Sequence, residues 1–218
     1  MNMFCTDTYK PAKVKAFTLV EVLITLGVIG IVAALTIPSL ISSTNDAQTV
    51  AKLKKFYATM TNATDAIKYD CGGSVENCLS TITNNSTCDN ELGALYAAKL
   101  NILKSCGTST GCFANEQYKR LLGGGVGVNL DTYTGGPKYI LADGISFQIS
   151  CYNSTYFYFW TDVNGAKPPN QYGRDLFFFS YYYDTKTIRP WNGDCVGVGE
   201  SHDMYCAGKV LLEDAINY

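Results

Sequence analysis

The strongest feature of the hydropathy pattern is an apolar run near the N-terminus. It extends from Phe17 to Pro38 and contains a single charged residue, Glu21. A run of about twenty residues is long enough to cross the hydrocarbon core of a membrane as one helix. A lone carboxylate in such a segment is energetically costly, so it marks a functional position whose partner has to be found.

Beyond Pro38 the pattern becomes amphipathic. One set of positions recurs every three or four residues, at Val50, Leu53, Tyr57, Met60, Thr64 and Ile67. This spacing predicts one buried stripe on a helix. We therefore predict a single helix from Phe17 to about Tyr69, roughly 80 Å long at 1.5 Å per residue. Gly72 and Gly73 mark its end, because glycine readily takes the left-handed conformation that follows a last helical turn.

The segment after this helix alternates between loops and helical patterns. Residues 74–88 are rich in Ser, Thr and Asn and predict a loop. A helix is predicted over 89–104, with Asp89 in the capping region, and a shorter helix over 113–122. The glycine-rich run at 123–128 predicts a flexible loop, because it lacks the Lys-Ser/Thr pair of a phosphate-binding loop.

From Tyr139 onward the hydropathy period changes to two, which is typical of strands. The strand candidates are 139–142, 145–150, 155–160 and 176–182. Asp143-Gly144 predicts a hairpin turn, so the sheet should be antiparallel with three or four strands. The tail at 206–218 predicts a closing helix or strand. The fold class is therefore α+β: a long N-terminal helix, with a transmembrane first half and an amphipathic second half, packs on a small antiparallel sheet with disulfide-rich loops.

Aromatic residues are concentrated in the strand candidates, and the chain has 16 tyrosines. Packing within the core and on the sheet faces accounts for them. An adhesive or subunit-contact surface is the alternative.

The cysteine pattern indicates the compartment. Cys5 precedes the apolar run, and eight cysteines follow it: Cys71, Cys78, Cys88, Cys106, Cys112, Cys151, Cys195 and Cys206. An even number beyond a membrane segment fits an oxidising compartment and up to four disulfides. Short loops favour the pairs Cys106–Cys112 and Cys195–Cys206. Zinc is not favoured, because the chain has no Cys-x-x-Cys and only one histidine, His202.

Charge gives the topology. Three lysines at positions 10, 13 and 15 precede the apolar run, and the next cations are at 52, 54 and 55. The positive-inside rule then places the N-terminus in the cytoplasm and the cysteine-rich domain outside. A secretory signal peptide is the competing interpretation, but the run is long for one and carries Glu21. The net charge of -2 does not indicate nucleic acid as a partner.

The order small–Phe–Thr–Leu–x–Glu at residues 16–21, followed by an uncharged apolar run, resembles the N-terminal signature of type IV pilins and type II secretion pseudopilins. That family usually has Gly before the cut, and this chain has Ala16. The resemblance implies cleavage between Ala16 and Phe17, with N-methylation of Phe17. It divides the chain into a prepilin leader (1–16), a transmembrane assembly helix (17–38), its amphipathic continuation (39–70) and an extracytoplasmic globular domain (71–218).

The resemblance also implies a function. The chain would be a structural subunit of a type IV pilus-like or type II secretion pseudopilus filament, not an enzyme. Its partners would be copies of itself, other pilins, the prepilin peptidase and the assembly platform in the membrane. It would be held in the cytoplasmic membrane by a single pass and then join an extracytoplasmic filament, in the periplasm or on the cell surface. Glu21 would support assembly by neutralising the Phe17 amine of a neighbouring subunit. The alternative is an enzyme or binding domain that an uncleaved helix anchors to the membrane.

A second candidate site lies between two strand candidates. Asp162 and Asn164 stand in an Asp-x-Asn-Gly turn, and Asp175 follows ten residues after that turn. Two carboxylates and an amide oxygen are ligands that suit calcium, and the pattern resembles the calcium-binding loop of major pseudopilins. Ca²⁺ is the only cofactor that these residues suggest. The alternative is an Asx turn that simply joins two strands.

Overall fold

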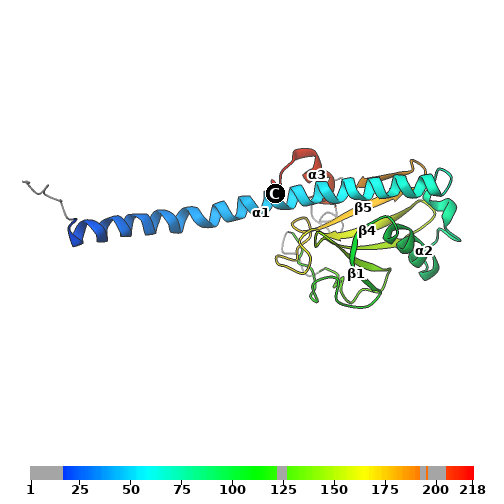
Figure 1. Ribbon diagram of the computed structural model, residues 1–218, viewed down its shortest axis with the longest axis horizontal. Coiled ribbons are helices and arrows are strands. Elements are labelled where there is room, and N and C mark those ends of the chain that lie inside the picture. Colours follow the sequence, from blue (N-terminus) through cyan, green and yellow to red (C-terminus); the bar gives the residue numbers. More distant parts are fainter. Residues whose placement is uncertain (1–16, 122–126, 192–194, 196–204) are drawn as a thin grey trace, which may run out of the picture. The chain divides into compact units, whose positions relative to one another are not determined.

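A computed structural model describes residues 17–121, 127–191, 195 and 205–218 (Figure 1). The chain divides into two compact units, Met1–Ser43 and Thr44–Tyr218. The boundary falls inside helix α1 (Leu19–Asp70), which is the long helix predicted from the sequence. In the first unit, the segment Leu19–Pro38 is long and apolar enough to span a membrane, and none of it is buried within the chain.

The second unit contains the buried stripe of α1. Five of the six predicted stripe positions are buried: Val50, Leu53, Met60, Thr64 and Ile67. Tyr57 is only half-buried, and the neighbouring Phe56 takes the central place, with its ring 5.6 Å from that of Phe179. Gly73 N–H donates to the Lys68 carbonyl, 2.7 Å away, and closes the helix end where the glycines predicted it.

The sheet has six strands in the order β1-β2-β3-β4-β5-β6, and every neighbouring pair is antiparallel. The strands are β1 (Ile102–Gly107), β2 (Lys138–Leu141), β3 (Ser146–Cys151), β4 (Tyr156–Asp162), β5 (Leu176–Tyr182) and β6 (Thr187–Pro190). The expected three or four strands correspond to β2 to β5. The two edge strands, β1 and β6, were missed, so the predicted strand number was wrong.

Apolar residues cover both faces of the sheet. Alternate residues of β4 and β5 point to opposite sides, as a strand's period of two requires. Phe157, Phe159 and Phe179 belong to the core that α1 covers. Tyr158, Trp160, Leu176 and Phe178 belong to a second cluster. The tyrosines on the strands are therefore divided between two packed layers, and Tyr158 and Tyr181 are both buried.

The helices between α1 and the sheet differ from the prediction. Residues 75–78 form a short 3-10 helix, η1 (Val75–Cys78), within the expected loop. Helix α2 (Ser86–Ala97) begins earlier than expected, because Asn85 Oδ1 caps it by accepting from Cys88 N–H at 2.9 Å. Asp89 is not the cap: its carboxylate lies in the core and accepts from Cys151 N–H at 2.7 Å.

Two helix predictions were wrong for the same physical reason. The predicted helix over 89–104 ends at Ala97, because Ile102 pairs with Leu141 in the sheet. The predicted helix over 113–122 is absent from its described part, 113–121. There Lys119 N–H donates to the Asn170 carbonyl instead of to a preceding turn. In both cases pairing with a distant strand or loop replaced local helical hydrogen bonds.

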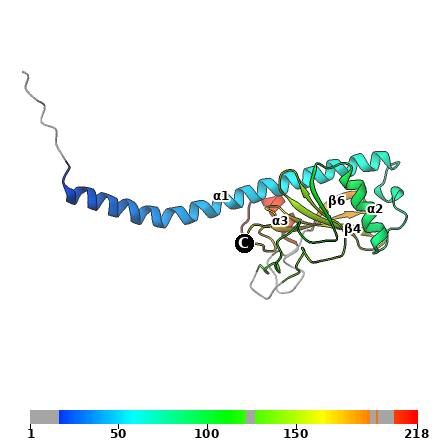
Figure 2. The ribbon, with the colours of Figure 1, turned by 60° about the horizontal axis from the view of Figure 1, so that its bottom comes forward.

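The remaining elements close the second unit. The tail forms helix α3 (Cys206–Glu213), which settles the choice between helix and strand. Helix α2 lies at the same end of this unit as the C-terminal end of α1 (Figure 2). The described part of the glycine-rich run, residues 127 and 128, has no regular secondary structure, and its other residues lie outside the described chain.

All eight cysteines beyond α1's apolar segment are paired. The disulfides are Cys71–Cys78, Cys88–Cys151, Cys106–Cys112 and Cys195–Cys206. The two pairs that short loops favoured are both among them. Three bridges close loops of 6 to 11 residues, whereas Cys88–Cys151 joins α2 to β3 across 63 residues.

Candidate functional site

The first candidate site is the start of α1. Ala16 lies outside the described residues, and Phe17 is 84% exposed. Glu21 Oε2 accepts from Thr18 N–H at 2.9 Å and from Thr18 Oγ1 at 2.8 Å, while Glu21 N–H donates to Thr18 Oγ1 at 3.2 Å. Thr18 and Glu21 therefore form a reciprocal capping box.

This capping box leaves part of Glu21 available. Both hydrogen bonds from Thr18 end on Oε2, so the capping box does not use Oε1. The carboxylate can thus hold the helix end and still accept from a cationic donor of another molecule. Sequence reasoning included Thr18 in the N-terminal motif but gave it no role, although the Thr-x-x-Glu spacing is a recognisable capping signal.

The second candidate site is the loop between β4 and β5, in the second unit. Asp162 is the last residue of β4 and Asp175 immediately precedes β5. Both side chains are fully buried. The two residues are brought together at the same end of the strand pair, because Asp162 pairs with Leu176 and Val163 N–H donates to the Asp175 carbonyl at 2.9 Å.

Each carboxylate has its own set of donors. Asn164 N–H donates to Asp162 Oδ1 at 3.0 Å, so the Asx turn predicted as the alternative is present. Gln171 N–H and Asn170 N–H donate to the two oxygens of Asp175 at 2.6 and 2.7 Å. Gly165 follows with φ of +71°, a left-handed conformation that favours glycine.

Burial dominates the electrostatics of this pair. It raises the pKa of Asp175 to about 6, although the N–H donors of Gln171 and Asn170 partly oppose the rise. Burial, reinforced by the nearby Asp175 charge, raises the pKa of Asp162 well above its ordinary value. Two carboxyl groups in this setting cannot both ionise cheaply without a compensating positive charge.

Tyr118 completes the environment of Asp162. Its hydroxyl donates to Asp162 Oδ2 at 2.5 Å. Burial and the Asp162 charge raise the pKa of Tyr118, which keeps the hydroxyl protonated as a donor. Sequence reasoning missed Tyr118, because it precedes Asp162 by 44 residues and no local motif links them.

Two buried amide oxygens in the same loop lack donors. The Oδ1 atoms of Asn164 and Asn170 are buried without a hydrogen-bond partner. In the described ranges, no cluster of three or more His, Cys, Asp or Glu side chains is placed to hold a metal. A cation here would therefore be held by two carboxylates together with amide and carbonyl oxygens, a donor set that fits a hard cation such as Ca²⁺.

The fold and the N-terminal site define a class of protein. The long apolar helix, the antiparallel sheet and the disulfides fit the α+β pilin-like fold. The family model described as the prokaryotic N-terminal methylation motif matches residues 11–37, and this motif is the type IV pilin and pseudopilin signature. No curated protein and no solved structure matches the chain. The motif supports a pilin-like or pseudopilin structural subunit, with a helix suited to membrane anchoring.

Proposed function

We propose that this chain is the precursor of a filament subunit that is cut between Ala16 and Phe17 and polymerises through α1. The observation that carries the proposal is the methylation motif at residues 11–37, which spans the start of α1 and Glu21. The filament would be a type IV pilus-like fibre or a type II secretion pseudopilus. Its partners would be copies of this chain, other pilins, the prepilin peptidase and the assembly platform in the membrane.

Charge neutralisation would drive assembly in register. Cleavage creates a cationic amine at Phe17, and the Oε1 atom of Glu21 is the acceptor that the capping box leaves open. Pairing the amine of one subunit with Glu21 of its neighbour reduces the cost of holding both charges in lipid. The lysines before α1 would stay in the cytoplasm, with the disulfide-bonded unit outside.

The mature N-terminus tests the proposal. In cells that contain a prepilin peptidase, we expect mass spectrometry of the membrane fraction to show a chain that starts at N-methyl-Phe17. Cells that lack the peptidase are the control, and there the chain should retain residues 1–16. In peptidase-positive cells, a chain that still begins at Met1 and is not methylated would contradict the proposal. It would favour a domain anchored by an uncleaved helix.

We also propose that the loop between β4 and β5 binds Ca²⁺ through Asp162, Asn164 and Asp175. The donorless Oδ1 atom of Asn164 and the two buried carboxyl groups support this assignment. A bound Ca²⁺ would supply the positive charge that allows both carboxylates to ionise. Its role would be structural, to hold the loop at the end of β4 and β5.

Stability should respond to pH and calcium together. Without calcium, the folded state keeps a proton on Asp175 up to about pH 6, whereas the unfolded chain releases it near pH 4. The unfolding free energy should therefore fall as pH rises through this window, by about 2–3 kcal/mol. We expect millimolar Ca²⁺ to raise the melting temperature near neutral pH and to have less effect at about pH 5, where protons compete.

Asp162→Asn is the informative variant for calcium. Its Oδ1 can still accept from Asn164 N–H, and its Nδ2 can donate to the Tyr118 hydroxyl, so the turn should persist. The variant should melt higher than the wild type near neutral pH without calcium and should lose the calcium response. Asp184→Asn, at an exposed turn, is the control and should keep the response. A wild-type melting temperature that neither Ca²⁺ nor EDTA moves would contradict calcium binding.

A further inference from the structure

An aromatic pocket lies on the face of the sheet opposite α1. It has a volume of about 430 Å³, and eight of its twelve lining residues are aromatic. The rings of Trp160 and Phe178 come from β4 and β5 and belong to the cluster that α1 does not cover. The pocket is outside both sites described above, since neither Glu21 nor Asp162 lines it.

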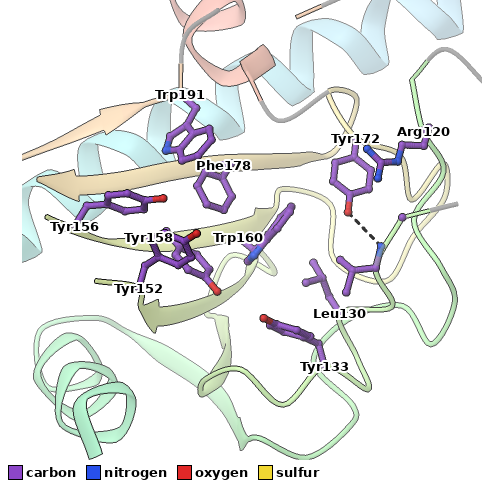
Figure 3. Close-up of a pocket in the computed structure, with 12 residues that line it drawn as sticks. Arg120, Leu130, Tyr133, Tyr152, Tyr156, Tyr158, Trp160, Tyr172, Phe178 and Trp191 are labelled. Carbon is purple, nitrogen blue, oxygen red and sulfur yellow. Dashed lines mark hydrogen bonds between the residues drawn. The ribbon is translucent and has the colours of Figure 1, made fainter. Parts of the chain in front are cut away.

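The rings present faces and edges to a common hollow (Figure 3). Trp160 and Trp191 both stand edge-on to Phe178, with centroids 4.8 and 4.5 Å away. Tyr152 stacks on Tyr156 at 5.0 Å and is 48% exposed, so this end of the pocket is open to solvent. Such an open set of rigid rings is a preformed contact surface for a ligand with flat apolar faces.

Polar groups line the same hollow. The phenol groups of Tyr152 and Tyr156 and the indole of Trp160 bring polar atoms to the lining. Arg120 lines the other end, with its guanidinium 5.4 Å from the centre of the Tyr172 ring. The pocket therefore combines aromatic faces with several donors and acceptors.

The pocket wall is held by buried hydrogen bonds. Lys138 is fully buried, and its Nζ donates to the carbonyls of Asp131 at 2.6 Å and Tyr133 at 3.0 Å. These bonds fix the loop that contributes Leu130 and Tyr133 to the pocket. A preformed wall lowers the ordering cost that a ligand would otherwise meet on binding.

We propose that this pocket binds a saccharide. A pyranose ring has C–H faces that pack on aromatic rings and an equatorial belt of hydroxyl groups that pair with phenol, indole and guanidinium groups. A quaternary ammonium ion would use the rings alone and would leave the phenol and indole groups unpaired. A purely apolar ligand would leave the polar groups of the pocket unpaired. The inference does not depend on filament assembly, because the pocket belongs entirely to the second unit.

Intrinsic fluorescence can report on this pocket selectively. The chain has two tryptophans, and both of them, Trp160 and Trp191, line the pocket. The full chain would be purified in a polyoxyethylene detergent, because a sugar-headed detergent would compete. It would be titrated with maltose, lactose and di-N-acetylchitobiose, and with sorbitol as a polyol that has hydroxyl groups but no ring. We expect a saturable change in tryptophan fluorescence with at least one disaccharide and none with sorbitol.

A matched pair of variants locates the binding. Tyr152→Ala should weaken the affinity for the responding disaccharide roughly tenfold, as the loss of one aromatic contact does. Tyr69→Ala removes an 87% exposed tyrosine from α1, far from the lining, and should leave the affinity unchanged. No response to any of the three sugars, an equal response to sorbitol, or saturable binding of tetramethylammonium without sugar binding would each overturn the proposal. So would an equal loss in both variants.

Discussion

Replacing Glu21 with glutamine is expected to abolish filament assembly while the protein still inserts in the membrane. Glutamine can occupy the third position of a capping box, so Thr18 should remain bonded and α1 should start at the same place. The negative charge is lost, however, and the Phe17 amine of a neighbour then enters the lipid unpaired. Such a charge costs about 2.5–3.5 kcal/mol, or about a hundredfold in the association constant per subunit.

The measurement is the amount of chain in sheared or pelleted filaments relative to total membrane protein, with processing at Phe17 followed in parallel. Thr18→Ala is the matched control: it removes the side-chain half of the capping box but keeps the Glu21 charge. It should weaken the helix start by about 1 kcal/mol and still assemble. If Glu21→Gln assembled like the wild type and Thr18→Ala did not, Glu21 would act through the helix cap and not through charge.

Long periodic patterns made most of the fold predictable. Helix α1 and strand β5 were predicted within two residues at each end, because a long apolar run and a short aromatic-rich run each leave few alternatives. The edge strands β1 and β6 were not predicted. Lys104 and Ser105 in β1 are exposed, and Ile188 is the only buried residue of β6, so neither strand has an alternating apolar pattern. β1 becomes a strand by pairing with β2, and β6 becomes a strand by pairing with β5.

The candidate sites, like the edge strands, depend on contacts between residues that are distant in the sequence. Glu21 could be chosen from the sequence because it is the single charged residue in an apolar run. Asp162 and Asp175 could be chosen because one lies in the Asp-x-Asn-Gly turn and the other follows it. The residues that define their chemistry are contributed by folding: Tyr118 reaches Asp162 across 44 positions, and Asn170 contributes both a donor to Asp175 and a donorless Oδ1 atom. The aromatic pocket was foreseen only as a choice between sheet packing and a contact surface. Sheet packing is present, since Tyr158 is buried, whereas a contact surface that would use exposed rings such as Tyr152 stays a prediction.

Removing the Cys88–Cys151 disulfide should destabilise the second unit more than removing one of the short-loop bridges, Cys71–Cys78 or Cys106–Cys112. In the chain-entropy account, a bridge stabilises by restricting the unfolded chain, and the gain grows with loop length. Cys88–Cys151 closes a separation of 63 residues, against 7 for Cys71–Cys78. The expected losses are about 4 and about 2 kcal/mol, respectively.

Double alanine variants allow this comparison, because alanine leaves no unpaired polar group in the buried positions of Cys88 and Cys151. The measurement is the urea midpoint of the full-length protein in detergent, followed by tryptophan fluorescence. Asp89 gives α2 a second tie to β3 through Cys151 N–H and Ser150 Oγ, so the native contact should survive loss of the bridge. The destabilisation should then arise mainly in the unfolded chain. Equal midpoint shifts for Cys88→Ala/Cys151→Ala and Cys71→Ala/Cys78→Ala would contradict this, and would place the effect in the packing around each bridge.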